Sequence, residues 1–155
     1  MSSKRSKGLV AVAVLSSSAL AVRADGTEQP VAVAPDEVQW KPDARGPGLH
    51  AAVLSGDPKQ PGPYVLRVKM SEGARLPPHR HPDVRYVTVL TGVFYLGFGE
   101  TFDPSRLKAY PAGSLIVIPA NVAHFAWVKA GESIQQDSGW GPTGSSPAPP
   151  AGSGK

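Results

Sequence analysis

The chain of 155 residues contains no cysteine. This absence excludes a disulfide framework, a thiolate metal site and a cysteine nucleophile, because each of them needs the sulfur atom. Charged residues are also scarce, at 18% of the chain, while apolar residues reach 41%. That balance is typical of one packed globular domain. Nitrogen from the four histidines and oxygen from carboxylates are therefore the candidate ligands for any metal ion.

The sequence also lacks an apolar run of the roughly 20 residues that cross a bilayer. Its apolar stretch at residues 9–22 is interrupted by three serines and follows a basic head of Lys4, Arg5 and Lys7. Val22-Arg23-Ala24 then places small side chains where signal peptidase requires them. We therefore predict that residues 1–24 are a cleaved signal peptide and that the mature protein is periplasmic or secreted, free of the membrane.

Removal of this segment changes the formal net charge, which is +4 for the whole chain. Four of the 16 basic residues and none of the 12 acidic residues precede Asp25, so 12 residues of each sign remain. A net charge of zero provides no overall attraction to phosphate backbones. Nucleic acid is therefore not an expected partner.

Short apolar and β-branched runs, separated by glycine and proline, dominate the mature chain and predict strands. We expect residues 85–91 and 93–98 to pair as a hairpin across a turn at Thr91-Gly92. Residues 104–108 are the only stretch whose sequence allows a helical turn. The fold class is therefore all-β, a barrel or sandwich. The expected strands are residues 49–54, 64–70, 85–91, 93–98, 114–118, 124–129 and 132–136.

The composition also predicts the domain organisation. Pro30 and Pro35 mark residues 25–48 as an extended lead-in, and residues 49–140 contain the strands of the barrel domain. Residues 141–155 consist of Gly, Pro, Ser, Ala and Thr apart from the last Lys. Such a segment cannot bury enough surface to fold, so we predict a disordered tail.

Three histidines lie in two compact segments. His79 and His81 are one residue apart, so on a strand their side chains point to the same face. His124 follows the turn Pro119-Ala120-Asn121, and it completes a three-nitrogen site if its strand lies across the barrel from the first. We predict that these residues hold one divalent ion of Fe, Zn, Ni, Cu or Mn. The alternative is a set of non-ligating histidines in a protein that has lost its metal.

In these segments the sequence resembles the cupin superfamily. The first cupin motif is matched by Gly73, His79, His81 and Gly92, and the second by Gly113, Pro119 and His124. Three positions depart from the motifs: Arg85 replaces Glu, Asn121 replaces Gly and Val128 replaces Asn. The resemblance covers residues 65–135. It implies a cupin-type β-barrel, also called a double-stranded β-helix or jelly roll, which is often a homodimer and has one metal ion inside its mouth.

The departure at Arg85 bears on the chemistry, because a guanidinium cannot ligate a metal. Next to a dication held by three neutral imidazoles, Arg85 would raise the local positive potential and favour an anionic substrate. Alternatively, a carboxylate of Asp83, Glu100 or Asp103 neutralises Arg85, which then serves as structure at the barrel mouth. Glu100 is also a candidate for a substitute fourth metal ligand.

The resemblance implies a range of activities. Some cupin dioxygenases hold iron by three histidines alone, so one hypothesis is an iron-dependent dioxygenase for a small oxygenated substrate, anionic or enolisable. The other is a non-catalytic, metal-dependent module that binds or senses a small ligand. Strand parity predicts that Val87 and Val89 face the cavity with Arg85, while Phe125 and Trp127 point away from the face of His124.

Overall fold

The protein was analysed as a computed structural model that describes residues 30–148. Within this range the helical elements are two 3-10 turns, η1 (Pro35–Glu37) and η2 (Pro104–Arg106), each with proline at its first turn, where the missing N–H costs nothing. The turn η2 lies within residues 104–108, where the sequence allows a helical turn, whereas η1 lies in the stretch that the sequence predicts to be extended. No helix within residues 30–148 has the length and apolar character needed to cross a membrane. The predicted signal peptide lies outside the described residues.

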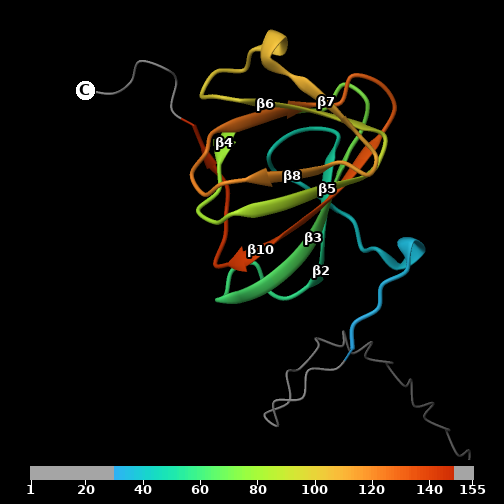
Figure 1. Cartoon of the computed structure of the whole chain (residues 1–155). Helices are drawn as coiled ribbons and strands as arrows, with labels where there is room; N and C mark the ends of the chain where they lie inside the picture. The colour runs from blue at the N-terminus through green and yellow to red at the C-terminus, as the bar shows by residue number, and fades with distance from the viewer. Residues whose placement is uncertain (1–29, 149–155) are drawn as a thin grey trace, which may run out of the picture. The chain divides into compact units, whose positions relative to one another are not determined.

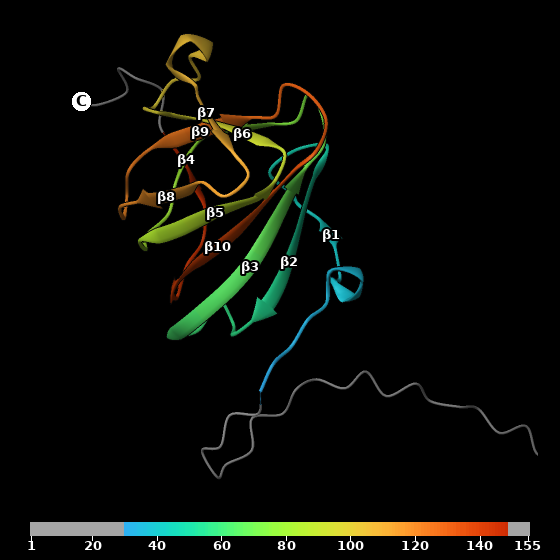
Figure 2. The ribbon, with the colours of Figure 1, turned by 45° about the vertical axis from the view of Figure 1, so that its right-hand side comes forward.

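The strands form two antiparallel sheets, which Figures 1 and 2 show as two layers. The first sheet has the order β1-β2-β3-β10-β5-β8, with bounds Lys41–Pro42, Leu49–Ser55, Gly62–Met70, Ser133–Gly141, Arg85–Thr91 and Leu115–Ile118. The second sheet has the order β11-β4-β9-β6-β7, with bounds Ser146–Pro147, Arg75–Arg80, His124–Trp127, Val93–Phe98 and Lys108–Pro111. This arrangement confirms the predicted all-β jelly roll.

The apolar core lies between the two sheets and explains the alternation along the strands. On β5, Arg85, Val87 and Val89 are buried while Tyr86 is 52% exposed, as expected for a strand with one face on the core. Leu96 from β6 and Ala126 from β9 meet them from the other sheet. Each fully buried aliphatic side chain of this kind contributes about 1.5–3 kcal/mol to folding. Both valines point inward, but only Val87 lines the cavity with Arg85 as predicted, whereas Val89 packs in the core.

The hairpin predicted at Thr91-Gly92 is wrong. Strand β5 pairs with β10 and β8, whereas β6 pairs with β7 and β9, so the chain crosses between sheets here. Gly92 makes the crossing with φ +69°, and a Cβ on it would lie 2.1 Å from the backbone oxygen of Glu132. Local sequence shows that the chain turns, but burial of both strand faces decides which strands pair.

The prediction of a disordered tail from Gly141 onwards also needs correction. Residues 133–141 form the long strand β10, and Ser146 and Pro147 form β11, which pairs with β4 at Arg80 and His79. Backbone hydrogen bonds from Thr143 to Pro58 and from Ala148 to Pro78 hold the same segment. We call residues 142–148 the C-terminal segment. Its order comes from pairing with distant parts of the chain, which its composition does not reveal; residues 149–155 lie outside the described range.

Candidate metal centre

The three histidines lie close together on neighbouring strands. His79 lies on β4, His81 directly follows that strand, and His124 begins β9. Strands β4 and β9 are paired with His79 opposite His124, so the second segment is beside the first and not across the barrel from it. The ring centroids are 4.3 Å apart for His79 and His124, 4.9 Å for His79 and His81, and 5.2 Å for His81 and His124. One nitrogen from each ring lies within 4.8 Å of the other two.

Local sequence explains how these side chains are placed. Pro77-Pro78 has no N–H to donate to the ladder, and the pairing register of β4 with β9 shifts between Leu76 and His79. Asn121 adopts φ +62°, and its N–H donates to the carbonyl of His81 at 2.7 Å. Asparagine tolerates this left-handed backbone, so its replacement of the motif glycine preserves the turn.

Backbone carbonyl groups fix the orientation of all three imidazoles. Nδ1 lies 2.8 Å from the Pro77 oxygen in His79, 2.6 Å from the Gly144 oxygen in His81 and 2.9 Å from the Val122 oxygen in His124. A carbonyl oxygen only accepts, so each Nδ1 carries the proton and donates it. In each neutral ring the Nε2 lone pair is therefore free to bind a metal ion, the arrangement common among metal-ligating histidines.

The electrostatic surroundings favour neutral imidazoles. Burial lowers the pKa of His79 to about 3 and that of His81 to about 2, with further lowering from His124 on the first and Arg85 on the second. Burial also lowers the pKa of His124. All three rings are therefore uncharged near neutral pH, which is the protonation state that binds a metal. The chemistry and orientation of these residues fit a divalent metal ion.

Arg85 lies beside the histidines, and its charge is paired with two carboxylates. Its side chain lines the same cavity and is buried. Nη1 is 3.1 Å from Oδ2 of Asp137, Nε is 3.8 Å from Oδ1 of Asp83, and Nη2 donates to Oγ1 of Thr143 at 3.1 Å. The structure therefore supports the alternative in which Arg85 is neutralised, with Asp83 as one predicted partner and Asp137 as a partner that no sequence pattern indicated.

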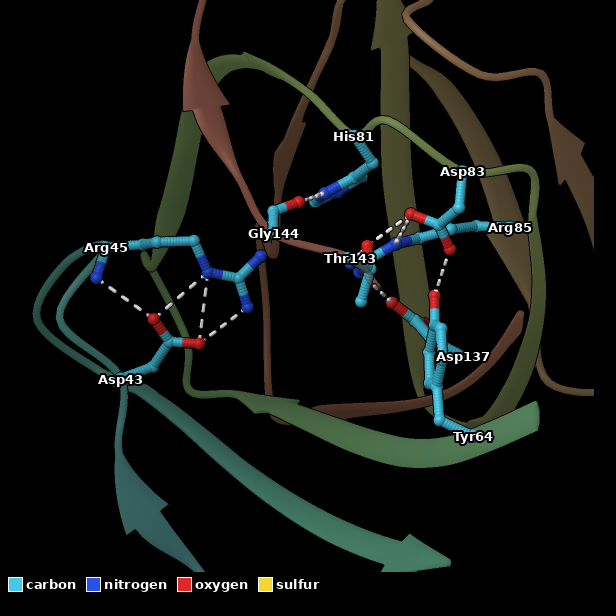
Figure 3. A network of polar contacts seen from close by, with 9 residues as sticks. All are labelled: Asp43, Arg45, Tyr64, His81, Asp83, Arg85, Asp137, Thr143 and Gly144. Atoms are coloured by element: carbon cyan, nitrogen blue, oxygen red, sulfur yellow. Dashed lines mark hydrogen bonds and ion pairs between the residues drawn. The ribbon is translucent and has the colours of Figure 1, made fainter. Parts of the chain in front are cut away.

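Figure 3 shows that this arginine is part of a larger network. The carboxylate of Asp83 accepts hydrogen bonds from the hydroxyls of Tyr64 and Thr143. Thr143 is followed by Gly144, whose carbonyl accepts from His81. Arg85 stands where cupins have a metal-binding carboxylate. It is connected to His81 of the candidate metal centre through Thr143, which it contacts, and the adjacent Gly144, which contacts His81. No sequence motif indicated the roles of Thr143 and Gly144.

Glu100 does not join the histidine cluster. Its carboxylate forms an ion pair with Nη2 of Arg80, and its side chain is 40% exposed. Among the described residues, the group of potential metal ligands contains the three histidines and no carboxylate. Asp103 likewise does not neutralise Arg85, because its carboxylate accepts hydrogen bonds from Ser105 at the start of η2.

A second arginine, Arg45, faces the histidine cavity from the loop between β1 and β2. Its Nε lies 3.0 Å from both carboxylate oxygens of Asp43, and Nη2 is 2.5 Å from Oδ2. This pair holds the pKa of Asp43 below its ordinary value against the opposing effect of burial. An Asp and an Arg two residues apart in a loop form no recognisable motif, so nothing in the sequence indicates a role for Arg45.

The fold and the site define a class of protein: a jelly-roll cupin with a cluster of three histidines that could hold a metal ion. The sequence matches the ChrR cupin-like domain family over residues 28–134, and the chain belongs to that family. Asp137, Thr143 and Gly144 lie beyond the matched range. No curated protein matches the chain in sequence.

Solved structures with similar folds include proteins that are named for different activities. KdgF from Halomonas sp. is 22% identical with a TM-score of 0.56, over 70% of this chain and 92% of KdgF. The polyketide cyclase RemF from Streptomyces resistomycificus is 17% identical with a TM-score of 0.63, over 72% of this chain and 80% of RemF. The DMSP lyase DddQ from Ruegeria pomeroyi DSS-3 is 16% identical with a TM-score of 0.60, over 76% and 64%. These similarities establish the fold and leave the reaction open.

Proposed function

We propose that the protein binds one divalent metal ion through Nε2 of His79, His81 and His124, and that a small, oxygen-bearing organic anion binds at this ion. The observation that carries the proposal is the donation of all three Nδ1 protons to backbone carbonyls. This arrangement leaves three lone pairs of neutral rings in one buried cavity. A bound metal would supply Lewis-acid polarisation and orientation of the ligand's oxygen atoms.

The balance of charge supports an anionic ligand, although for a different reason from the one given by the sequence. Arg85 does not provide free positive charge, because Asp83 and Asp137 surround it. The side chains around the site are two arginines, Arg45 and Arg85, and three aspartates that pair with them. Their net charge is −1, so a bound divalent metal ion would bring the net charge of the site to +1. Burial raises the pKa of Asp137, and protonation of this group would make the total +2. In both states an anion improves the balance.

Within this function, iron-dependent dioxygenation is the first reaction that we propose to test, because three imidazoles with open coordination positions suit iron. Non-catalytic binding or sensing is the second candidate. One observation favours it: the carboxylate of Asp137, which lines the histidine cavity, is engaged by Arg85. Among the described residues that line this cavity, no free carboxylate is therefore available as a general base. Export to the periplasm or the exterior completes the proposal and rests on residues 1–24.

Metal analysis tests the proposed function, and the fourth histidine provides a matched control. His50 lies on β2, outside the cluster. The wild-type protein and the His50→Ala variant should each retain about one divalent ion per chain after loading and dialysis, whereas His79→Ala and His124→Ala should lose it. A wild-type protein that retains no metal, or cluster variants that retain it fully, would refute the site. Oxygen uptake with diketones and phenolic acids then separates an oxygenase from a binding protein.

A further inference from the structure

Two cavities of very different size meet at the candidate metal centre and share Arg45, Leu76 and His79. The inner cavity is lined by the three histidines and has a volume of about 30 Å³. A space of this size accommodates only one or two water-sized groups. The body of an organic ligand therefore does not fit beside a metal ion in the inner cavity, although a small polar head group does.

The outer cavity is large enough for the body of an organic ligand. Its volume is about 580 Å³, which lies within the range of roughly 300–1,000 Å³ that small-molecule pockets occupy. Polar residues in its lining include Glu100, whose charge is paired with Arg80. The apolar part of the wall comes from Leu76, Pro77, Pro78, Phe102, Pro147 and Ala148. A ligand that reaches the histidines from here therefore needs an apolar body and a small head.

Arg45 lies where the two cavities meet, and one nitrogen of its guanidinium group is available to donate a hydrogen bond to a ligand. Nε and Nη2 are engaged with Asp43, whereas Nη1 has no hydrogen-bond partner among the described residues. Figure 3 shows this third nitrogen directed away from Asp43. Because Asp43 already fixes the guanidinium plane, little conformational entropy is lost when a second anion binds to Nη1. A planar carboxylate accepts such a hydrogen bond from a guanidinium, and it is small enough for an oxygen atom of it to reach into the inner cavity.

We propose that the outer cavity holds the apolar body of an organic carboxylic acid, and that its carboxylate enters the inner cavity beside Arg45 and the three histidines. This inference rests on the proposed function and names its class of ligand. Arg45 is thereby a residue that determines specificity: it selects a carboxylate over a neutral group of the same shape. The apolar wall selects against acids too short to fill the outer cavity.

Calorimetric titration of the zinc-loaded full chain tests the inference with three probes. The probe 3-phenylpropionate has both the carboxylate and the apolar body, 3-phenylpropanamide keeps the body without the charge, and acetate keeps the charge without the body. We expect 3-phenylpropionate to bind about tenfold or more tightly than each of the others, since a hydrogen bond to a charged group and a buried aromatic body are each worth that much. Equal binding of the acid and the amide would overturn the inference.

Variants test the two cavities separately. Arg45→Gln should weaken binding of 3-phenylpropionate about tenfold or more. Thr101→Trp places a large side chain in the outer cavity and should weaken the same binding while leaving acetate binding unchanged. The control is Arg67→Gln, which removes an arginine that lines neither cavity and is bonded to Gln136. If Arg45→Gln binds the acid as well as Arg67→Gln does, the role of Arg45 is refuted.

Measurement of zinc content in the same samples separates this inference from the proposed function. A chain that takes up no zinc contradicts the metal site, and the inference that rests on it falls as well. A fully loaded chain that does not bind 3-phenylpropionate contradicts the inference alone. The titration is repeated on a chain that ends at Ala148. Binding seen only in this shortened chain would show that residues 149–155 occupy the outer cavity, which would overturn the assignment of a small acid to it.

Discussion

Arg85 and Asp137 form a buried ion pair beneath the histidine cluster, with 3.1 Å between Nη1 and Oδ2. The two residues are 5% and 8% exposed, so water compensates neither charge. At the position where the cupin motif has a metal-binding Glu, this chain therefore has a cation whose charge is used within the protein. The pair joins β5 to β10, and Thr143 extends it into the C-terminal segment.

The first prediction concerns the stability of this pair. Asp137→Asn should reduce the free energy of unfolding by about 3 kcal/mol or more, because it leaves a buried guanidinium short of negative charge. The double variant Arg85→Met, Asp137→Leu should lose much less, since two apolar side chains need no partner. Urea unfolding followed by circular dichroism measures both. A double variant less stable than Asp137→Asn would contradict this account.

The second prediction concerns the link from Arg85 to the metal centre. Thr143→Val removes the hydroxyl that accepts from Arg85 and donates to Asp83, so the adjacent Gly144 carbonyl no longer holds His81 firmly. The affinity for zinc should fall by about 10–100-fold, as is usual when an outer partner of a ligating histidine is disturbed.

Competition with a chromophoric chelator measures this affinity, and Thr143→Ser is the matched control. Serine retains the hydroxyl and should restore zinc affinity to nearly the wild-type value. A Ser variant that binds zinc as weakly as the Val variant would show that the methyl group, and not the hydrogen bonds of the hydroxyl, positions this segment.

The third prediction concerns alkaline pH. Burial and the hydrogen bond to Asp83 raise the pKa of Tyr64 to about 12. In the unfolded chain this phenol ionises near the ordinary pKa of about 10, so above that pH the unfolded state releases a proton that the folded state keeps. The stabilisation from Tyr64 is therefore complete below about pH 10 and is lost as the pH rises toward about 12.

Phenolate absorbance tests this directly, because it increases as each of the four tyrosines of the chain ionises. In the folded wild-type protein Tyr64 should ionise only as the pH approaches about 12, and this late step should be missing from Tyr64→Phe. The stability of Tyr64→Phe should also decline less between about pH 10 and 12. A late step that persists in this variant would assign it to another tyrosine.

The fourth prediction concerns the packing behind the outer cavity. A Cβ on Gly97 would lie 2.5 Å from the ring of Phe125, which is fully buried and lies 5.1 Å from Phe102 between ring centroids. Gly97→Ala should therefore cost about 1–3 kcal/mol through overpacking. In a Phe125→Leu background the same substitution should cost less, and a double-mutant cycle measures this coupling. Additive effects of the two changes would show that the ring does not obstruct a methyl group at this position.

Much of this structure follows from local sequence. Alternation along residues 85–91 predicts their burial pattern, and the strand bounds 85–91 and 93–98 agree with the structure because each run is closed by residues that favour a turn. The short spacing of His79 and His81 brings these two side chains together without reference to the rest of the fold. The lack of cysteine likewise restricts any metal site to nitrogen and oxygen ligands, whatever the topology.

The tertiary structure alone decided what surrounds the histidines. Arg85 meets Asp137 across 52 positions of sequence, and His81 meets the Gly144 carbonyl across 63. Local patterns show which way a side chain faces, but strand pairing is set by the burial of whole sheet faces, and it alone determines which distant residues become neighbours. For that reason the sequence determined a cupin with three clustered histidines, whereas only the folded chain showed a neutralised arginine and a C-terminal segment that helps to build the site.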